Sequence, residues 1–284
     1  MKLSTSRFLK SIQNQLVFIK KVWQEFTADN CPLLAASISY YVLFSLFPLT
    51  LVVISIASFI FESSVLEMQI MRAMRNLLPI SSEYIISTVH GVVSARGAIG
   101  IIAALGLIWS GTSVFKAVRI SLNTAWGVRK PRSFLYARLI ELVMMISTGL
   151  LLLFSVVLTA GMQAIHQLSS QSIGSMVFNN DLFGTFMGTL VSAGVTYVVF
   201  LLLFKYVPNT LVRWKDIWLG ALAAMVCFEI TKSIFIWFVG EFGRYNLVYG
   251  SIGALIALLM WCYISAMIFL FFAKLTSVST KGTP

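Results

Sequence analysis

The stretch Ile252–Ala273, IGALIALLMWCYISAMIFLFFA, contains no charged residue. A helix of about 20 residues, rising about 1.5 Å per residue, spans the hydrocarbon core of a bilayer, so this stretch is predicted to cross a membrane. Apolar residues make up 58% of the 284-residue chain and charged residues only 11%, against about 45–50% and about 25% in a soluble domain. This composition excludes a soluble enzyme, a disordered chain and a secreted disulfide scaffold, and it indicates an integral membrane protein.

Five further stretches are long and apolar enough to cross a bilayer. Backbone groups in hydrocarbon must be hydrogen-bonded within the segment, and no ten-residue alternation indicates a barrel, so the spans are predicted to be helical. The sequence therefore predicts an all-α polytopic membrane protein, a bundle of six transmembrane helices with short interfacial helices. The predicted spans are about 33–61, 97–115, 139–165, 182–204, 217–239 and 252–273.

Three segments flank or interrupt the predicted membrane domain, which covers residues 33–275. Residues 1–32 carry apolar side chains at intervals of three to four among lysines, which is typical of an amphipathic helix lying on the inner leaflet. A solvated helix packed on the bundle is the alternative. Residues 62–96 are predicted to form an outer loop with two short interfacial helices, and residues 276–284 a cytoplasmic tail.

Basic residues are unevenly shared between the two predicted sides of the membrane. The N-terminal segment, the second and fourth loops and the C-terminal tail together hold 16 Lys and Arg residues, whereas the other side holds four. Cytoplasmic loops carry the excess of Lys and Arg in membrane proteins, so both termini are predicted to be cytoplasmic. The net charge of +11 favours membrane lipids with anionic headgroups at the cytoplasmic face as partners, rather than nucleic acid.

Glu229 and Lys232 lie inside the predicted fifth span, one helical turn apart. Glu229 is roughly 18 Å and 15 Å from the two ends of that span, close to the bilayer centre. Each charge at that depth costs about 2.5–3.5 kcal/mol on insertion scales, so such residues face the protein interior or a wet cavity. The pair is a candidate substrate or proton site; the alternative is a structural ion pair that fixes helix register.

The first span carries a polar stripe. Ser37, Tyr41 and Ser45 recur at four-residue steps, Tyr40 is adjacent, and Pro48 follows one turn beyond as a tolerated kink. The stripe is a candidate wall of a substrate cavity opposite Glu229. Hydrogen bonding between helices is the alternative explanation.

Other positions are predicted to be structural or interfacial. In the fourth span, Gly184 and Gly188 begin a ladder of small residues at four-residue steps, which favours close helix packing within the bundle or in a homo-oligomer. Asn123 and Trp126 precede a basic loop whose cations either meet lipid phosphates or anchor the topology. At the outer end of the sixth span, Tyr245 and Tyr249 are candidate substrate-binding residues or members of the interfacial aromatic belt, and Gly250 is predicted to be structural.

The chain shows no pattern of metal or cofactor ligands. Its cysteines and histidines are far apart and form no C-x-x-C or H-E-x-x-H motif. A nucleotide-binding loop is also missing from the sequence. We therefore expect no metal and no cofactor, and a protein that is not an enzyme. The cysteines are Cys31, Cys227 and Cys262, and the histidines are His90 and His166.

The order of several landmarks along the chain resembles the YihY/BrkB family, over roughly residues 20–275. The resemblance implies a bacterial inner-membrane protein with six helices. That family carries an old label, ribonuclease BN, and a link to virulence and serum resistance, and some members have been connected with export of lipid or lipopolysaccharide precursors. The landmarks are Ala35-Ala36-Ser37-Ile38-Ser39-Tyr40-Tyr41, Leu46-Phe47-Pro48, Asn123, Trp126, Pro208, Trp214-Lys215, Gly220, Glu229, Lys232, Tyr249-Gly250-Ser251 and Trp261.

Two features of this sequence bear on what the resemblance implies. The family usually ends its last span with a Gly-Ala-Glu-like segment, whereas this chain has Phe272-Ala273-Lys274 there. Any function of the family's glutamate is therefore absent from this protein or carried by another residue. Metal-dependent cleavage of RNA needs clustered carboxylates or histidines. The acids are scattered along this chain, which argues against ribonuclease activity.

The sequence thus supports three hypotheses about function. The leading one is a transporter of a lipid-linked or amphipathic envelope component, in which Lys232 faces a phosphate-bearing headgroup. The second is a scaffold for envelope assembly that transports nothing and uses the Glu229–Lys232 pair as architecture. The third is a small-ion or proton-coupled carrier, which shares the pair and needs no lipid-sized cleft.

Overall fold

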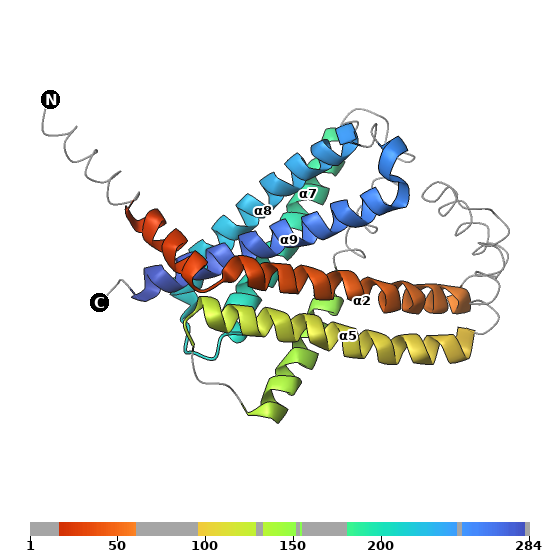
Figure 1. Cartoon of the computed structure of the whole chain (residues 1–284), viewed down its shortest axis with the longest axis horizontal. Coiled ribbons are helices and arrows are strands. Elements are labelled where there is room, and N and C mark those ends of the chain that lie inside the picture. Colours follow the sequence, from red (N-terminus) through yellow and green to blue (C-terminus); the bar gives the residue numbers. More distant parts are fainter. Residues whose placement is uncertain are drawn as a thin grey trace, which may run out of the picture. The chain divides into compact units, whose positions relative to one another are not determined.

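The computed structural model describes residues 17–60, 96–128, 133–151, 154, 181–242 and 246–281. Within these ranges all regular structure is helical (Figure 1). Six helices are long and apolar enough to cross a membrane, so the prediction of an all-α polytopic membrane protein is confirmed. The helices are residues 17–28, α2 (Cys31–Ile60), α5 (Arg96–Ala125), Phe134–Leu151, α7 (Asp181–Tyr206), α8 (Trp214–Phe242) and α9 (Asn246–Lys281).

Several helices extend beyond the predicted spans. Helix α5 continues to Ala125, ten residues past the predicted end of the second span, and α9 continues through residues assigned above to the tail. The third membrane helix begins at Phe134 rather than at Leu139. The second and sixth spans are predicted to end before the first cation, whereas α5 and α9 continue past that point, and Arg119 and Lys274 on these extensions are paired with acids. The outer-loop helices predicted within 62–96 lie outside the described residues, apart from Arg96, which begins α5.

The chain divides into two compact units. Unit 1 comprises Met1–Leu33, Arg119–Lys232 and Met267–Pro284, and unit 2 comprises Leu34–Val118 and Ser233–Ala266. Each unit is built from segments far apart in the sequence. Most of the fully buried side chains in the described residues belong to unit 1, including Phe26, Leu122, Phe204, Ile217 and Leu270.

Two turns position the charged residues of unit 1. Asn30 adopts a φ of 53°, a left-handed conformation that Asn tolerates, and this turn separates the helix 17–28 from α2. Helix α5 ends at Ala125, and Gly127, two residues later, has a φ of 66°. The Gly127 and Val128 amides donate to the carbonyls of Thr124 and Asn123, at 2.9 and 2.8 Å, which is the Schellman arrangement that terminates a helix.

Helices in unit 1 pack through small residues and rings. A Cβ added to Gly220 of α8 would lie 3.2 Å from the Cβ of Thr276 in α9, so the two helices approach closely at this point. Four rings join α7, α8 and α9, with centroids 5.5–6.3 Å apart; they belong to Phe200, Phe204, Phe228 and Phe269. The helix 17–28 packs on α9 through Phe26, which meets Phe271 edge-on at 5.7 Å.

Unit 2 pairs α2 with α5. A Cβ on Gly106 would lie 3.5 Å from the Pro48 side chain, an ordinary van der Waals contact. The Phe44 ring meets Trp109 edge-on at 6.0 Å. Large apolar side chains on both helices remain exposed, for example Phe47 and Ile102, as expected for surfaces that face lipid.

Candidate functional site

Glu229 and Lys232 lie in the middle of α8, within unit 1. The Lys232 ammonium is 2.5 Å from Glu229 Oε2, and it donates a hydrogen bond of 3.3 Å to Ser192 Oγ of α7. The Lys232 side chain is 29% exposed and the Glu229 side chain 16%. The charges are therefore in contact and partly covered, and the Lys232 side chain keeps access to its surroundings.

The hydrogen bond from Lys232 joins the pair to α7. Ser192 belongs to the small-residue ladder of α7, and its short side chain lets the lysine reach across from α8. Two turns further along α7, Phe200 meets Phe228 of α8 edge-on at 5.8 Å. The Lys232 ammonium thus contacts a carboxylate and a hydroxyl, an arrangement that can bind an anion or exchange a proton.

A buried carboxylate in the helix Phe134–Leu151 is the main charged residue that sequence reasoning missed. Glu141 is 1% exposed, and its Oε1 accepts hydrogen bonds of 3.0 and 2.8 Å from Nε and Nη2 of Arg119. Its Oε2 accepts a bond of 3.0 Å from Nη1 of Arg138. Two arginines sharing one acid leave this group with one net positive charge. In the sequence, the signal for this ionic group was an acidic residue inside a predicted span, with Arg138 one helical turn before it.

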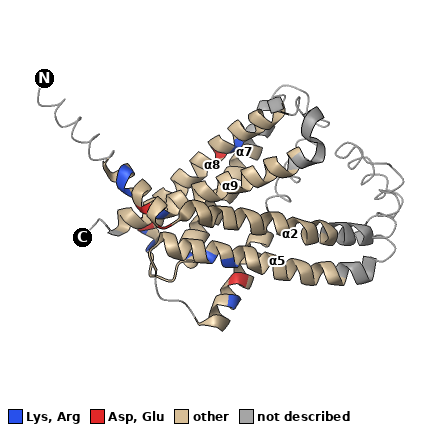
Figure 2. Ribbon diagram, in the orientation of Figure 1, with Lys and Arg blue, Asp and Glu red and all other residues tan. Residues whose placement is uncertain are grey.

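Lys274 forms a second buried ionic group. Its ammonium lies 2.7 Å from Asp29 Oδ2 and 3.0 Å from Glu25 Oε2, and its side chain is 5% exposed. Both acids come from the helix 17–28 and the turn after it, so the lysine joins that segment to α9. The segment thereby packs on the membrane domain, while its Lys20, Lys21 and Trp23 remain exposed. Figure 2 shows the Lys, Arg, Asp and Glu residues of the described helices in colour.

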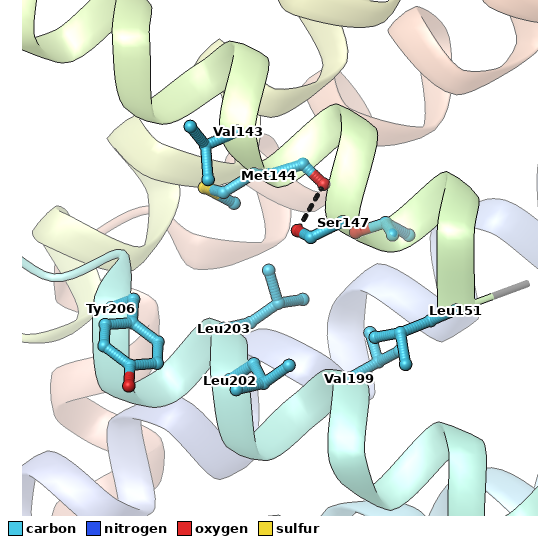
Figure 3. A pocket seen from close by; sticks show the side chains of 9 residues that line it. Val143, Met144, Ser147, Leu151, Val199, Leu202, Leu203 and Tyr206 are labelled. Carbon is cyan, nitrogen blue, oxygen red and sulfur yellow. Dashed lines mark hydrogen bonds between the residues drawn. The ribbon is translucent and has the colours of Figure 1, made fainter.

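An apolar cavity of about 290 Å³ lies between the helix Phe134–Leu151 and α7 (Figure 3). Five lining residues come from the first helix and four from α7, and neither Glu229 nor Lys232 is among them. The Ser147 hydroxyl donates to the Met144 carbonyl at 3.1 Å, so the lining is mainly hydrocarbon. The lining residues are Val143, Met144, Ser147, Thr148, Leu151, Val199, Leu202, Leu203 and Tyr206.

The polar stripe of α2 belongs to unit 2, whereas Glu229 and Lys232 belong to unit 1. Ser45 donates to the Val42 carbonyl of its own helix at 2.8 Å. Tyr40 is 60% exposed and Tyr41 36%, and their rings meet edge-on at 5.5 Å. Ser37 is half-buried. A cavity wall formed by this stripe opposite Glu229 stays a prediction.

Other predicted positions are placed as follows. The Asn123 Oδ1 atom accepts a hydrogen bond of 2.8 Å from the Asn209 amide, which ties the end of α5 to the loop before α8. Trp126 is buried next to this contact in the chain. A Cβ on Gly188 would meet no atom within 4 Å, so the described chain provides no close neighbour there.

Several predicted residues lie in parts for which side chains are not described. Gly184 lies in the first turns of α7, and Tyr249 and Gly250 lie in the first turn of α9. Tyr245, His90 and His166 lie outside the described residues. Across the described part of the chain, no three side chains of His, Cys, Asp or Glu come together as a metal site would require.

Comparisons with known proteins place the chain among bacterial membrane proteins. A UPF0761 membrane protein of Alteromonas mediterranea is 30% identical over 92% of this chain and 85% of its own length. A UPF0761 membrane protein of Tolumonas auensis is 29% identical over 95% of this chain and 86% of its own length. The ribonuclease-like protein YfkH of Bacillus subtilis is 26% identical over 93% of this chain and 95% of its own length.

No solved structure gives a significant match to the chain. The profile of the family described as virulence factor BrkB matches residues 22–283, from the helix 17–28 to the end of α9. The chain therefore belongs to the virulence factor BrkB family.

Proposed function

We propose that this protein is a transporter in the bacterial inner membrane, with both termini in the cytoplasm, that moves a lipid-linked or amphipathic envelope component. It is not an enzyme in this proposal, and the substrate or proton site is the Glu229–Lys232 pair. The observation that carries the proposal is the partial exposure of Lys232, 29%, in the middle of a membrane-spanning helix. Charges at that depth are costly and are usually functional.

The geometry of Lys232 suits reversible binding of an anionic group. An ammonium has three N–H donors, and among the described residues Lys232 directs two of them, toward Glu229 and Ser192. A phosphate oxygen bound by the third donor would gain a charge-assisted hydrogen bond. Glu229 then balances the lysine charge when no substrate is present, so that the empty site carries no net charge.

The energy for transport would come from a gradient or from a partner protein, because the sequence has no nucleotide-binding loop. The relative named ribonuclease-like protein suggests RNA cleavage as another function. The described residues offer no cluster of acids or histidines for it, and we do not propose it.

A scaffold that transports nothing is the second candidate. It is favoured by the contact between Glu229 and Lys232 one turn apart on the same helix. The whole role of such a matched ion pair can be to fix the register of its helix against its neighbours. On that view, replacing both residues by apolar ones leaves function intact. A small-ion carrier would instead require the pair for ion transport, and it would not translocate lipid.

Reconstitution into vesicles that contain a phospholipid with a fluorescent headgroup tests the proposal. Translocation is measured as the loss of fluorescence when an impermeant quencher is added outside. We expect Lys232→Ala to slow translocation about 30-fold, the equivalent of roughly 2 kcal/mol for one charge-assisted hydrogen bond, and Lys232→Arg to restore part of the rate. Lys20→Ala, which removes an exposed cation from the helix 17–28, is the control. A normal rate in a well-folded Lys232→Ala variant would refute the proposal.

A further inference from the structure

The cavity between the helix Phe134–Leu151 and α7 is a second place where unit 1 can hold a ligand (Figure 3). Its volume is about 290 Å³, whereas an engineered apolar cavity of about 150 Å³ in another protein stays dry and binds benzene. A buried water needs two to four polar partners, and the Ser147 hydroxyl in the lining is already bonded to the Met144 carbonyl. An apolar ligand therefore fits this cavity better than water.

The surroundings of the cavity indicate what that ligand is. Both lining helices are candidate membrane spans, so the neighbouring medium is lipid. Two lining residues, Val143 and Tyr206, are 56% and 58% exposed, which leaves the cavity accessible from outside the helix pair. Along α7 the lining runs from Val199 to Tyr206, a rise of about 10 Å, which suits an extended hydrocarbon chain.

The Tyr206 end of the cavity leads to a cationic segment. The Tyr206 ring meets the Trp214 ring edge-on at 6.2 Å, and the Lys205 ammonium lies 5.2 Å from the centre of the same Trp214 ring. Tyrosine and tryptophan are enriched at the headgroup level of membranes. One aromatic ring thus separates the apolar cavity from a lysine.

The same segment has a surplus of positive charge. Residues 205–216 hold three cations and one acid. Asp216 accepts a hydrogen bond of 3.0 Å from Arg213, whose side chain is 78% exposed, and Lys215 is also exposed. A ligand with an apolar chain and a negatively charged head matches this combination of cavity and cations.

We propose that this cavity binds an anionic glycerophospholipid. One acyl chain lies between the helix Phe134–Leu151 and α7, and the headgroup phosphate lies against Lys205, Arg213 and Lys215. The site shares no residue with the Glu229–Lys232 pair, so the proposal does not rest on transport. It holds for a transporter, for which the lipid would be a bound regulator, and equally for a scaffold.

Native mass spectrometry of the detergent-purified full chain tests the site, with phosphatidylglycerol and phosphatidylcholine of identical chains added separately after delipidation. We expect one tightly bound lipid, with phosphatidylglycerol preferred. Val199→Trp fills the cavity from α7 and should abolish the adduct. Val198→Trp is the matched control, because Val198 is the neighbouring residue, is 39% exposed and does not line the cavity.

A second pair of variants tests the same cavity from its other wall. Thr148 lines the cavity and Leu150 does not, so Thr148→Trp should lose the lipid and Leu150→Trp should keep it. This pair decides the question if Val199→Trp does not fold, as judged by gel filtration and thermal unfolding. Equal binding by the cavity variants and their controls would overturn the site.

The headgroup contact has its own test. Lys205→Gln should weaken phosphatidylglycerol binding about fivefold, which corresponds to roughly 1 kcal/mol for one basic residue near a membrane surface, and should leave phosphatidylcholine binding unchanged. Lys20→Gln removes the same charge from another helix and should change neither. Equal affinity for the two lipids in the parent chain would overturn the anionic specificity. A Val199→Trp variant that loses dimers rather than lipid would assign the cavity to a second copy of the chain.

Discussion

Lys232 and Lys274 are both paired with carboxylates in unit 1, and they differ in burial and in the origin of their partners. Lys274 is 5% exposed and is bonded to Glu25 and Asp29, which lie 245 or more residues earlier in the chain. Lys232 is 29% exposed and is bonded to Glu229 of its own helix. The first lysine links two distant segments, whereas the second belongs to a pair already formed by one helix.

This difference separates a structural ion pair from a candidate site. Removing Lys274 leaves two acids without their cation at the contact between α9 and the helix 17–28. Replacing both Glu229 and Lys232 removes an ion pair within one helix, together with the hydrogen bond from Lys232 to Ser192 of α7. Stability should therefore depend on the buried groups, and activity on the α8 pair.

The largest effect is expected at Glu141, which belongs with Lys274 as a buried ionic group. Glu141→Ala leaves Arg119 and Arg138 next to each other without their acid, and Arg119 is only 15% exposed. Breaking a buried pair costs about 3–5 kcal/mol, and we expect a loss of that size in the free energy of unfolding, measured by denaturant titration in micelles. A loss below about 1 kcal/mol would show that this group behaves as a surface pair.

Lys274→Met should destabilise the chain by about 2–3 kcal/mol, less than a fully buried pair, because Glu25 and Asp29 are 39% and 33% exposed. Thermal unfolding in detergent measures the effect. The triple variant Glu25→Gln, Asp29→Asn and Lys274→Met removes the whole ionic group, and it should recover most of the loss. If the triple variant is no more stable than Lys274→Met alone, the acids are not the reason for the loss.

The two lysines also show what sequence reasoning could predict. Six spans and their helical nature followed from apolar length alone, and the Glu229–Lys232 contact followed from a spacing of one turn within one helix. The contact of Lys274 with Asp29 and that of Glu141 with Arg119 depend on the tertiary packing of segments that are 245 and 22 residues apart. No periodicity in a single sequence encodes such contacts.

The same limit applies to the bounds of the helices, which differ from those of the predicted spans. The count of apolar residues stopped the second span at 115, before Lys116, whereas α5 runs to Ala125 and includes Arg119, which is paired with Glu141. The departure from the family pattern at Lys274 was visible in the sequence. Its consequence, an ionic contact with the helix 17–28, required the fold.

A smaller effect is expected where α8 and α9 pack without charges. An added methyl at Gly220 meets Thr276, and overpacking costs about 1–3 kcal/mol, partly offset by the gain of about 0.8–1.0 kcal/mol in helix propensity. Gly220→Ala should therefore lower the free energy of unfolding by about 1 kcal/mol. Gly240→Ala on the same helix has open space around it, and it should raise stability. Equal effects of the two substitutions would contradict the close helix approach.

The smallest effect is expected for the pair of Arg213 and Asp216, in which the arginine is exposed and the acid is 17% exposed. Surface ion pairs contribute about 0.2–1 kcal/mol, and the Arg213 side chain is 78% exposed. Asp216→Asn should change the unfolding midpoint in denaturant by an amount equivalent to about 0.5 kcal/mol, and added salt should reduce the difference from the parent chain. A loss of stability as large as that caused by Lys274→Met would show that the exposure of an ion pair does not determine how much it contributes to stability.

The double variant Glu229→Leu, Lys232→Leu tests the central claim most directly, because it removes both charges and leaves neither one unpaired. The measurement is lipid translocation in vesicles, made on protein whose thermal unfolding has been compared with that of the parent chain. We predict that translocation falls to the background of protein-free vesicles while the unfolding temperature stays within about 3 °C, since a matched swap of a buried pair is often neutral. Translocation at the parental rate would contradict the account and leave the pair with a purely structural role.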